Sequence, residues 1–169
     1  MLKMKQKTAK FPRGTKPFIR QATEADCHDL APRLRLADLQ EVRNGSGSSG
    51  LDALLLGFRN SRDCHAVIAN GRVAMIFGAS DYQDGQGIVW AMGSPEIEAI
   101  AKFFHSEAAK WIASLSERYR AVISAVWEGN TKHIRWLRRL GFKFAPAMPI
   151  GNNSDAKFFP IYKELTRHV

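Results

Sequence analysis

Apolar positions recur at two different periods along the chain, and the changes of period mark the predicted strands and helices. A short strand is predicted over residues 18–22. The helix after it begins at Thr23, and the acid three residues later, Asp26, is typical of a capping box. We expect Pro32 to break or bend this helix, because proline lacks the donor N–H. A second helix is predicted over residues 51–58.

The segment between these helices, residues 44–50, consists of Asn, Gly and Ser alone. Such a composition gives a flexible chain that buries nothing. We expect a mobile loop, which either forms a permissive piece of surface or acts as a lid over a binding site.

A β-hairpin is the clearest local prediction. Asn70 and Gly71 stand between the apolar runs 64–69 and 72–79, and both positions of such a turn need a positive φ. A third strand is predicted over residues 88–92, after a polar turn. The three strands together form an antiparallel meander.

A long amphipathic helix follows the meander. Ser94 is its expected N-cap, and Pro95 occupies the first helical position. Residues 97–115 keep one apolar face through about six turns. The helix returns the chain to the sheet, where residues 121–127 are expected to lie parallel to 88–92 through a right-handed crossover.

The last part of the chain predicts a turn at 128–130, a short helix ended by Gly141, and two further strands, 142–148 and 157–165. Prolines in these two segments indicate edge or bulged strands. The predicted order is β-αα-βββ-α-β-α-ββ. The fold class is therefore α/β, a single domain with a central, mixed and mostly antiparallel sheet flanked by helices.

The net charge of +9 is unevenly placed over the 169 residues. Seven of the 25 basic residues and no acid fall in the first twenty positions, which leaves 18 basic against 16 acidic residues, or +2, for the rest. We divide the chain into a basic N-terminal arm, 1–17, and a domain, 18–169. The arm is either a solvated tail or a nucleic-acid contact through its basic side chains. These are Lys3, Lys5, Lys7, Lys10, Arg13 and Lys16.

The cysteines and the apolar runs indicate where the protein acts. Cys27 and Cys64 stand apart, without CxxC spacing or a nearby histidine ligand, so we expect two small core residues in a reducing compartment and no metal site. No apolar run reaches the roughly 20 residues of a membrane span, and we expect a cytoplasmic protein without a membrane partner.

Two family patterns resemble the segment from Trp127 to Phe142. Asn130, followed eleven positions later by Gly141-Phe142, resembles the C-terminal half of the GNAT acyl-CoA N-acyltransferase fold, whose usual pattern is N-x-x-A-x-x-x-Y-x-x-x-G-F. The stretch W-x-G-N-x-x-H-I-R-W-L is similar to a family of small internal virion proteins of short-tailed bacteriophages, itself GNAT-like. This chain has His133 in place of the pattern's alanine and Leu137 in place of its tyrosine.

The GNAT resemblance implies a cofactor, acetyl-CoA or CoA, held where the strands 88–92 and 121–127 diverge. The residues that it places at the cofactor are Val89, Trp90, Met92, Gly93, Ser94 and Asn130. The family's glycine-rich diphosphate loop is missing, and Glu96 and Glu98 stand near the expected diphosphate. We expect weak cofactor binding, because like charges oppose each other there; the same acids also suit the first turn of a helix.

No strong acid–base set is visible in the sequence. His133 and Glu128 are the candidate catalytic residues, since both lie near the expected split of the sheet. His133 replaces the missing tyrosine as proton donor, or packs locally without a catalytic role. Asn130 is a cofactor contact or only the N-cap of the helix after it.

Three functions remain open. The first hypothesis is a phage-encoded protein that acts through protein partners, in virion core assembly or on a host enzyme, in the host cytoplasm or in the virion. The alternative is an acetyl-CoA-dependent N-acyltransferase acting on an amine of a small molecule or protein. A second alternative is a nucleic-acid-binding accessory that uses the basic arm.

Overall fold

The computed structural model describes residues 15–166 of the chain. A sheet of eight strands forms its centre, in the order β1-β2-β3-β4-β5-β8-β6, with β7 paired to β8. The strands are β1 (Phe18–Gln21), β2 (Asp63–Ala69), β3 (Arg72–Asp81), β4 (Gln86–Gly93), β5 (Ala121–Trp127), β6 (Lys143–Phe144), β7 (Met148–Pro149) and β8 (Lys157–Glu164). The basic arm falls outside the described residues, apart from positions 15–17.

Five α-helices surround the sheet. They are α1 (Glu24–Leu30), α2 (Leu36–Gly45), α3 (Gly50–Asn60), α4 (Ala101–Ser114) and α5 (Thr131–Arg139). Four 3₁₀ turns connect elements, namely η1 (Ala31–Arg33), η2 (Gln83–Gly85), η3 (Pro95–Ile100) and η4 (Leu115–Glu117).

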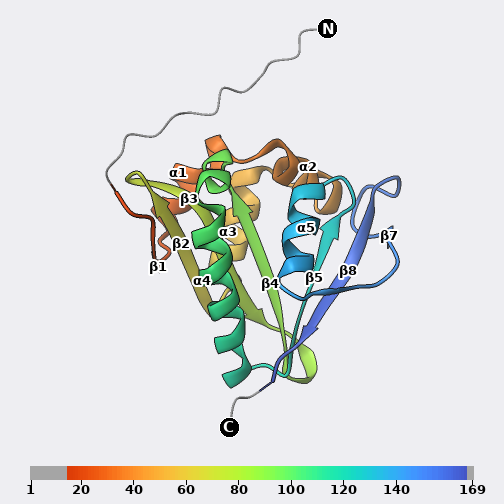
Figure 1. The fold of residues 1–169 in the computed structure, drawn as a ribbon. Helices are drawn as coiled ribbons and strands as arrows, with labels where there is room; N and C mark the ends of the chain where they lie inside the picture. Colours follow the sequence, from red (N-terminus) through yellow and green to blue (C-terminus); the bar gives the residue numbers. More distant parts are fainter. Residues whose placement is uncertain (1–14, 167–169) are drawn as a thin grey trace, which may run out of the picture.

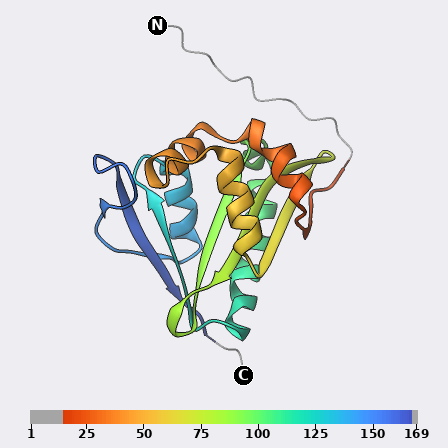
Figure 2. The ribbon, with the colours of Figure 1, turned by 180° about the vertical axis from the view of Figure 1, so that it is seen from behind.

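Two apolar cores lie on the two faces of the sheet. Helices α4 and α5 cover one face (Figure 1), and α1 and α3 cover the other, with α2 across one end (Figure 2). The core under α4 and α5 includes Phe77, Phe104 and Leu137, whereas the core under α1 and α3 is built around Leu30 and Leu54. Both faces of the sheet are therefore buried, as in other α/β domains.

The parallel pair β4 and β5 interrupts an otherwise antiparallel sheet. Their pairing covers three positions, from Gln86 with Ala121 to Ile88 with Ile123, and the strands separate beyond these residues. Figure 1 shows the gap widening toward the C-terminal ends of both strands, with α5 in front of it. Strand β5 stays paired with β8 over its whole length, so the sheet opens on one side of β5 alone.

Several local predictions are confirmed. Thr23 and Asp26 form the reciprocal capping box of α1, and Pro32 lies in the 3₁₀ turn that ends this helix. Asn70 has a φ of 52° at the hairpin turn, and Gly141 has a φ of 85° after α5. The predicted fold class, an α/β single domain with a mixed sheet flanked by helices, is confirmed as well.

Three details of the predicted order were wrong. The segment before β2 holds three α-helices instead of two, because α2 begins anew after the 3₁₀ turn at Pro32. The chain ends with three strands instead of two, since β6 and β7 pair separately with β8. The long helix begins as 3₁₀ over Pro95–Ile100, and Ser94 holds the predicted N-cap position without a capping hydrogen bond from its side chain. The Ser94 hydroxyl is buried and donates instead to the carbonyl of Ala74.

Candidate functional site

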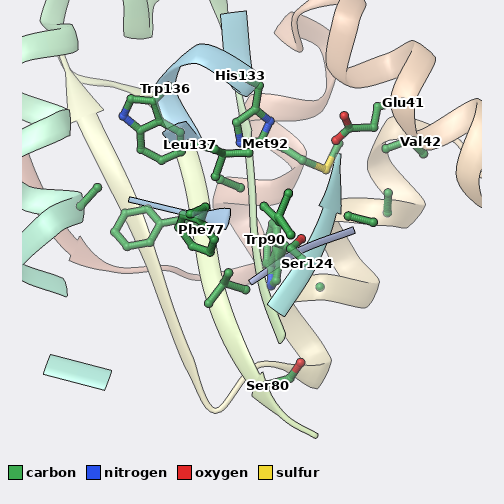
Figure 3. Close-up of a pocket in the computed structure, with 18 of the residues that line it drawn as sticks. Glu41, Val42, Phe77, Ser80, Trp90, Met92, Ser124, His133, Trp136 and Leu137 are labelled. Carbon is green, nitrogen blue, oxygen red and sulfur yellow. The ribbon is translucent and has the colours of Figure 1, made fainter. Parts of the chain in front are cut away.

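A cavity of about 360 Å³ crosses the sheet at the split between β4 and β5. On one face of the sheet Phe104 of α4 and Trp136 of α5 line it, and on the other face Glu41 of α2 and Leu56 of α3 line it. The strands contribute Val89, Trp90, Ala91, Met92, Ser124 and Ala125. In Figure 3, Glu41 and His133 point toward one end of the cavity and Ser80 lies at the other. A ligand in this cavity reaches both faces of the sheet.

The backbone of both strands presents N–H groups to the split. The Gly93 N–H donates to Asp38 Oδ2 over 3.0 Å, and the Trp127 N–H donates to Glu41 Oε2 over 2.9 Å. Because N–H groups along a strand alternate in direction, those of Ala91 and Ala125 point to the same side as these two. The middle of the split therefore offers strand amides to an extended ligand.

Two carboxylates of α2 close the wide end of the split. Asp38 accepts from the guanidinium of Arg35 and from the side-chain amide of Asn130, in addition to Gly93. Glu41, one helical turn later, accepts from Trp127 and from the same amide of Asn130, the latter over 3.3 Å. Helix α2 thereby connects the end of β4 to the end of β5.

Glu41 is the carboxylate that lines the cavity. Burial raises the pKa of its carboxyl to about 7, and the charge of Asp38 adds to this, while the hydrogen bond from Trp127 opposes it. Oε1 of Glu41 receives no hydrogen bond from the described residues, although Oε2 receives two. A carboxyl whose pKa is close to neutrality, beside a cavity, has the properties of a general base.

His133 lies on the α5 wall of the cavity. Burial lowers the pKa of its imidazole to about 4, so the ring is neutral at pH 7. Its Nδ1 is buried without a hydrogen-bond partner, and so is Nε1 of Trp136, whose ring lies 5.6 Å from that of His133. Two buried polar atoms on one wall are therefore available to a ligand.

A second pocket of about 270 Å³ lies between α4 and α5 and shares Phe104, His133 and Trp136 with the central cavity. Its outer part carries basic side chains, Arg35, Lys132, Arg135 and Arg139, together with Glu98. Glu98 forms an ion pair with Lys132 over 2.6 Å. The stacked rings of Phe104 and Trp136, 5.1 Å apart, form the boundary between the two pockets. The basic surface of the second pocket therefore lies next to the split, with these shared residues between the two.

The structure brings some of the predicted site residues together. Val89, Trp90, Met92 and His133 line the cavity. Gly93, Ser94 and Asn130 lie at its wide end, but their polar groups contact Asp38, Ala74 and Glu41.

Glu128, the second predicted catalytic residue, is exposed on the turn after β5 and does not line the cavity. The structure therefore places Glu128 apart from His133, and the catalytic role of each stays a prediction. Sequence reasoning did not find Asp38 or Glu41. Their only signal was the pair of acids at i and i+3 among the apolar residues of α2.

Comparison with known proteins identifies the fold. No family model and no curated protein sequence matches this chain. Solved structures do match it. A GNAT-family acetyltransferase from Streptococcus pneumoniae superposes with a TM-score of 0.60 at 15% identity, covering 89% of this chain and 100% of that one.

The chain has the GNAT fold. The ribosomal-protein-alanine N-acetyltransferase of Brucella melitensis aligns with a TM-score of 0.65 at 16% identity, over 88% of this chain and 99% of its own. The yncA protein of Salmonella typhimurium, solved with its cofactor acetyl-CoA, aligns with a TM-score of 0.64 at 13% identity, over 90% and 96% of the two chains. At such identities the likeness establishes the fold alone.

The residues of the site fit an acyl-CoA in part. The split offers strand amides, and the α5 wall offers the unpaired polar atoms of His133 and Trp136 to an amide-containing arm. The first turn after β4 fits a diphosphate poorly, because Asp38 already occupies the Gly93 N–H and Glu96 stands in that turn. The basic side chains of α5 are the better match for phosphate.

The described residues contain neither a metal-binding cluster nor a helix that could span a membrane. Between positions 15 and 166, no group of three or more His, Cys, Asp or Glu side chains could hold a metal ion. Within the same range, no helix combines the length and the apolar composition that crossing a membrane requires.

Proposed function

We propose that this protein is an acyl-CoA-dependent N-acyltransferase. The observation that supports it best is the cavity that passes through the sheet between β4 and β5. A thioester arm entering from the α4–α5 face and an acceptor entering from the α3 face would meet inside this cavity. The GNAT fold of the chain, shared with acetyltransferases of known structure, agrees with this arrangement.

Different residues of α5 would bind the two parts of the acyl-CoA, its amide-containing arm and its phosphate groups. Trp136 Nε1 and His133 Nδ1 are placed to hydrogen-bond an amide-containing arm on the α5 wall. Arg135 and Arg139 form no ion pair with the described residues, so their charges are free to contact phosphate groups. Glu98 neutralises Lys132 nearby, and we expect the affinity for acyl-CoA to be modest.

The cofactor supplies an activated acyl carbonyl, and the protein supplies orientation and the removal of a proton. The amides of Ala91 and Ala125 face the position of that carbonyl in the split. Leu137 stands where the GNAT pattern has its tyrosine, so the departing thiolate finds no phenol there. His133, neutral at pH 7, does not replace it as an acid, because its pKa is about 4.

Calorimetric titration with acetyl-CoA tests the proposal, supported by thermal unfolding. A ligand at a hundred times its dissociation constant stabilises the protein by about 2.7 kcal/mol. Ala125→Phe fills the split and should abolish binding. Ala113→Phe places the same ring on the exposed face of α4 and should leave binding unchanged. If acetyl-CoA fails to bind at millimolar concentration, or binds equally well to Ala125→Phe, the proposal is wrong.

The other functional hypotheses stay predictions from the sequence. The similarity of residues 127–137 to phage internal virion proteins still motivates a protein partner, a place in the virion and the host cytoplasm. The arm's contact with nucleic acid depends on residues that lie almost wholly outside the described range. Neither hypothesis accounts for the cavity.

A further inference from the structure

The half of the cavity on the α3 face forms a chamber of its own chemistry, which we name the acceptor chamber. Its walls are Glu41, Ser46, Leu56, Asn60, Trp90 and Met92. Leu56 is 61% exposed and stands at the mouth. Most of this surface is apolar, and Glu41 is its one ionisable side chain. A ligand that fits the chamber is therefore mainly apolar, with a polar group facing Glu41, while Ser46 and Asn60 add uncharged polar groups to the wall.

The wall opposite Glu41 is held in place. Trp90 Nε1 donates to the Ser61 hydroxyl over 2.8 Å, which fixes the position of the indole ring. The ring packs against the backbone of α3 at Gly57, where an added Cβ would lie 2.7 Å from two ring atoms. Glycine is therefore required at this close approach, and the chamber keeps a rigid aromatic wall.

The ionisable groups around Glu41 do not pair with its carboxylate. Asp38 and Arg35 act on Glu41 from its own side, and they form an ion pair with each other over 2.7 Å. His133 on α5 is neutral at pH 7. Ionised Glu41 therefore forms no ion pair with the described residues, the charge of Arg35 being the weakest influence on its pKa, and its Oε1 has no donor. A buried carboxylate of this kind gains most from a cation inside the chamber.

The rim of the chamber is tied together by hydrogen bonds between two segments that are far apart in the sequence. The C-terminal end of α2 is tied to the loop between β7 and β8 by two backbone hydrogen bonds, from Asn152 N to Gly45 O and from Asn153 N to Asn44 O. The side-chain amide of Asn152 also donates to the carbonyl of Ser46, a residue of the chamber wall. An extended peptide would need these backbone groups, which are already paired.

We propose that the acceptor chamber binds a small, mainly apolar primary amine, such as an arylalkylamine, with its ammonium group against Glu41. The proposal rests on the proposed acyl transfer and names its acceptor class and its base. The ammonium gives one proton to Glu41, and the freed lone pair of the nitrogen forms a C–N bond to the acyl carbon. The C–S bond breaks, and the second proton of the nitrogen goes to sulfur. An amide and a thiol result, and Glu41 returns its proton to solvent.

Binding of phenethylamine, compared with 2-phenylethanol, tests the proposal without any reaction. At pH 8, where Glu41 is mostly ionised, we expect phenethylamine to bind at least tenfold more tightly than the alcohol in calorimetric titrations. Glu41→Gln should remove this preference. Glu107→Gln, at a partly buried carboxylate of α4 that pairs with Lys110 and does not line the chamber, should keep it. Leu56→Trp, at the exposed mouth, should block both probes without disturbing the fold.

The outcomes separate the two proposals. If amine and alcohol bind equally, if Glu41→Gln keeps the preference, or if a short peptide with a free N-terminus binds better than phenethylamine, this inference is overturned. Acetyl-CoA titrations of the same proteins report on the proposed function separately. Acetyl-CoA should still bind to Leu56→Trp, and amine binding without acetyl-CoA binding would overturn acyl transfer but support the chamber.

Discussion

Replacing Asp38 by Asn should destabilise the protein more than any other single change of charge that we consider. Asp38 is 2% exposed and accepts four hydrogen bonds. Two come from the guanidinium of Arg35, one from the backbone of Gly93 and one from the side chain of Asn130, at distances of 2.7–3.1 Å. The carboxylate therefore connects α2 to the end of β4 and to the turn after β5.

The expected loss follows from the number of donors. An Asn side chain keeps one acceptor oxygen and turns an NH₂ group toward two of the four donors, so these two lose their acceptor. The Arg35 side chain, 13% exposed, loses its counter-charge at the same time. Removing one partner of a buried ion pair costs about 3–5 kcal/mol. In a domain of this size, each kcal/mol lowers Tm by about 2–4 °C, so we expect a drop of about 6–20 °C.

Urea unfolding followed by circular dichroism measures this loss directly. Asp52→Asn is the matched control, because Asp52 is exposed on the first turn of α3 and its carboxylate accepts one hydrogen bond, from the Ser49 hydroxyl. The control should lose less than about 1 kcal/mol. A loss below about 1 kcal/mol for Asp38→Asn would refute the argument that this carboxylate holds the two strand ends in place.

Three further predictions concern the site and its rim. Burial raises the pKa of Glu41 from 4.5 to about 7, so between these values the native state keeps a proton that the unfolded chain has lost, and stability falls as the pH rises. The difference in unfolding free energy between wild type and Glu41→Gln should change by about 3 kcal/mol from pH 4.5 to 7.5, and a constant difference would contradict the shift. Trp136→Phe keeps a ring that stacks on Phe104 but removes an unpaired N–H. Stability in urea should therefore change little, while calorimetry should show weaker binding of acetyl-CoA. Unchanged affinity would exclude this N–H as a contact of the ligand. Gly151 has a φ of +89° and lies against Gly45, so Gly151→Ala should destabilise the protein by at least about 1–2 kcal/mol. Amide exchange should become faster at the end of α2 and in the loop between β7 and β8. Exchange at the wild-type rate would count against coupling between these two segments.

Turns and helix ends whose backbone conformation is set by neighbouring residues were predictable from the sequence. The turn at Asn70 and Gly71 needs positive φ at both residues, and few other residue pairs tolerate it. Gly141 ends α5 for the same reason, and Pro32 removes a donor that a continuous helix would need. Each of these depends on chemistry within a few residues, so no tertiary contact had to be known.

The start of the long helix was not predictable in this way. Ser94 and Pro95 have the composition of an N-cap followed by a first helical residue, and that pattern alone favours an α-helix. In the structure the Ser94 hydroxyl finds a partner on β3, the carbonyl of Ala74. The helix start therefore lacks a side-chain capping bond, and the contact that the hydroxyl makes instead depends on the packed sheet.

The candidate site also has residues that were predictable from the sequence and residues that depend on tertiary contacts. Val89, Trp90, Met92 and His133, which line the cavity, were predicted because the GNAT resemblance implies a split between the strands 88–92 and 121–127. Glu41 was not predicted, since its role depends on how α2 lies across the end of the sheet. That placement follows from long-range contacts between α2 and the ends of β4 and β5.

The position of α2 also bears on the missing glycine-rich loop. Where such a loop closes on a diphosphate, the backbone amide at the end of β4 is available to the ligand. Here Asp38 occupies the Gly93 amide, and Glu41 occupies that of Trp127 on the opposite strand. The strand ends are therefore supported by protein carboxylates instead of a bound anion, and the split needs no ligand to satisfy these groups. If acyl-CoA binds as proposed, its diphosphate must find its partners elsewhere. Arg135 and Arg139 of α5, which form no ion pair with the described residues, line the basic pocket beside the cavity.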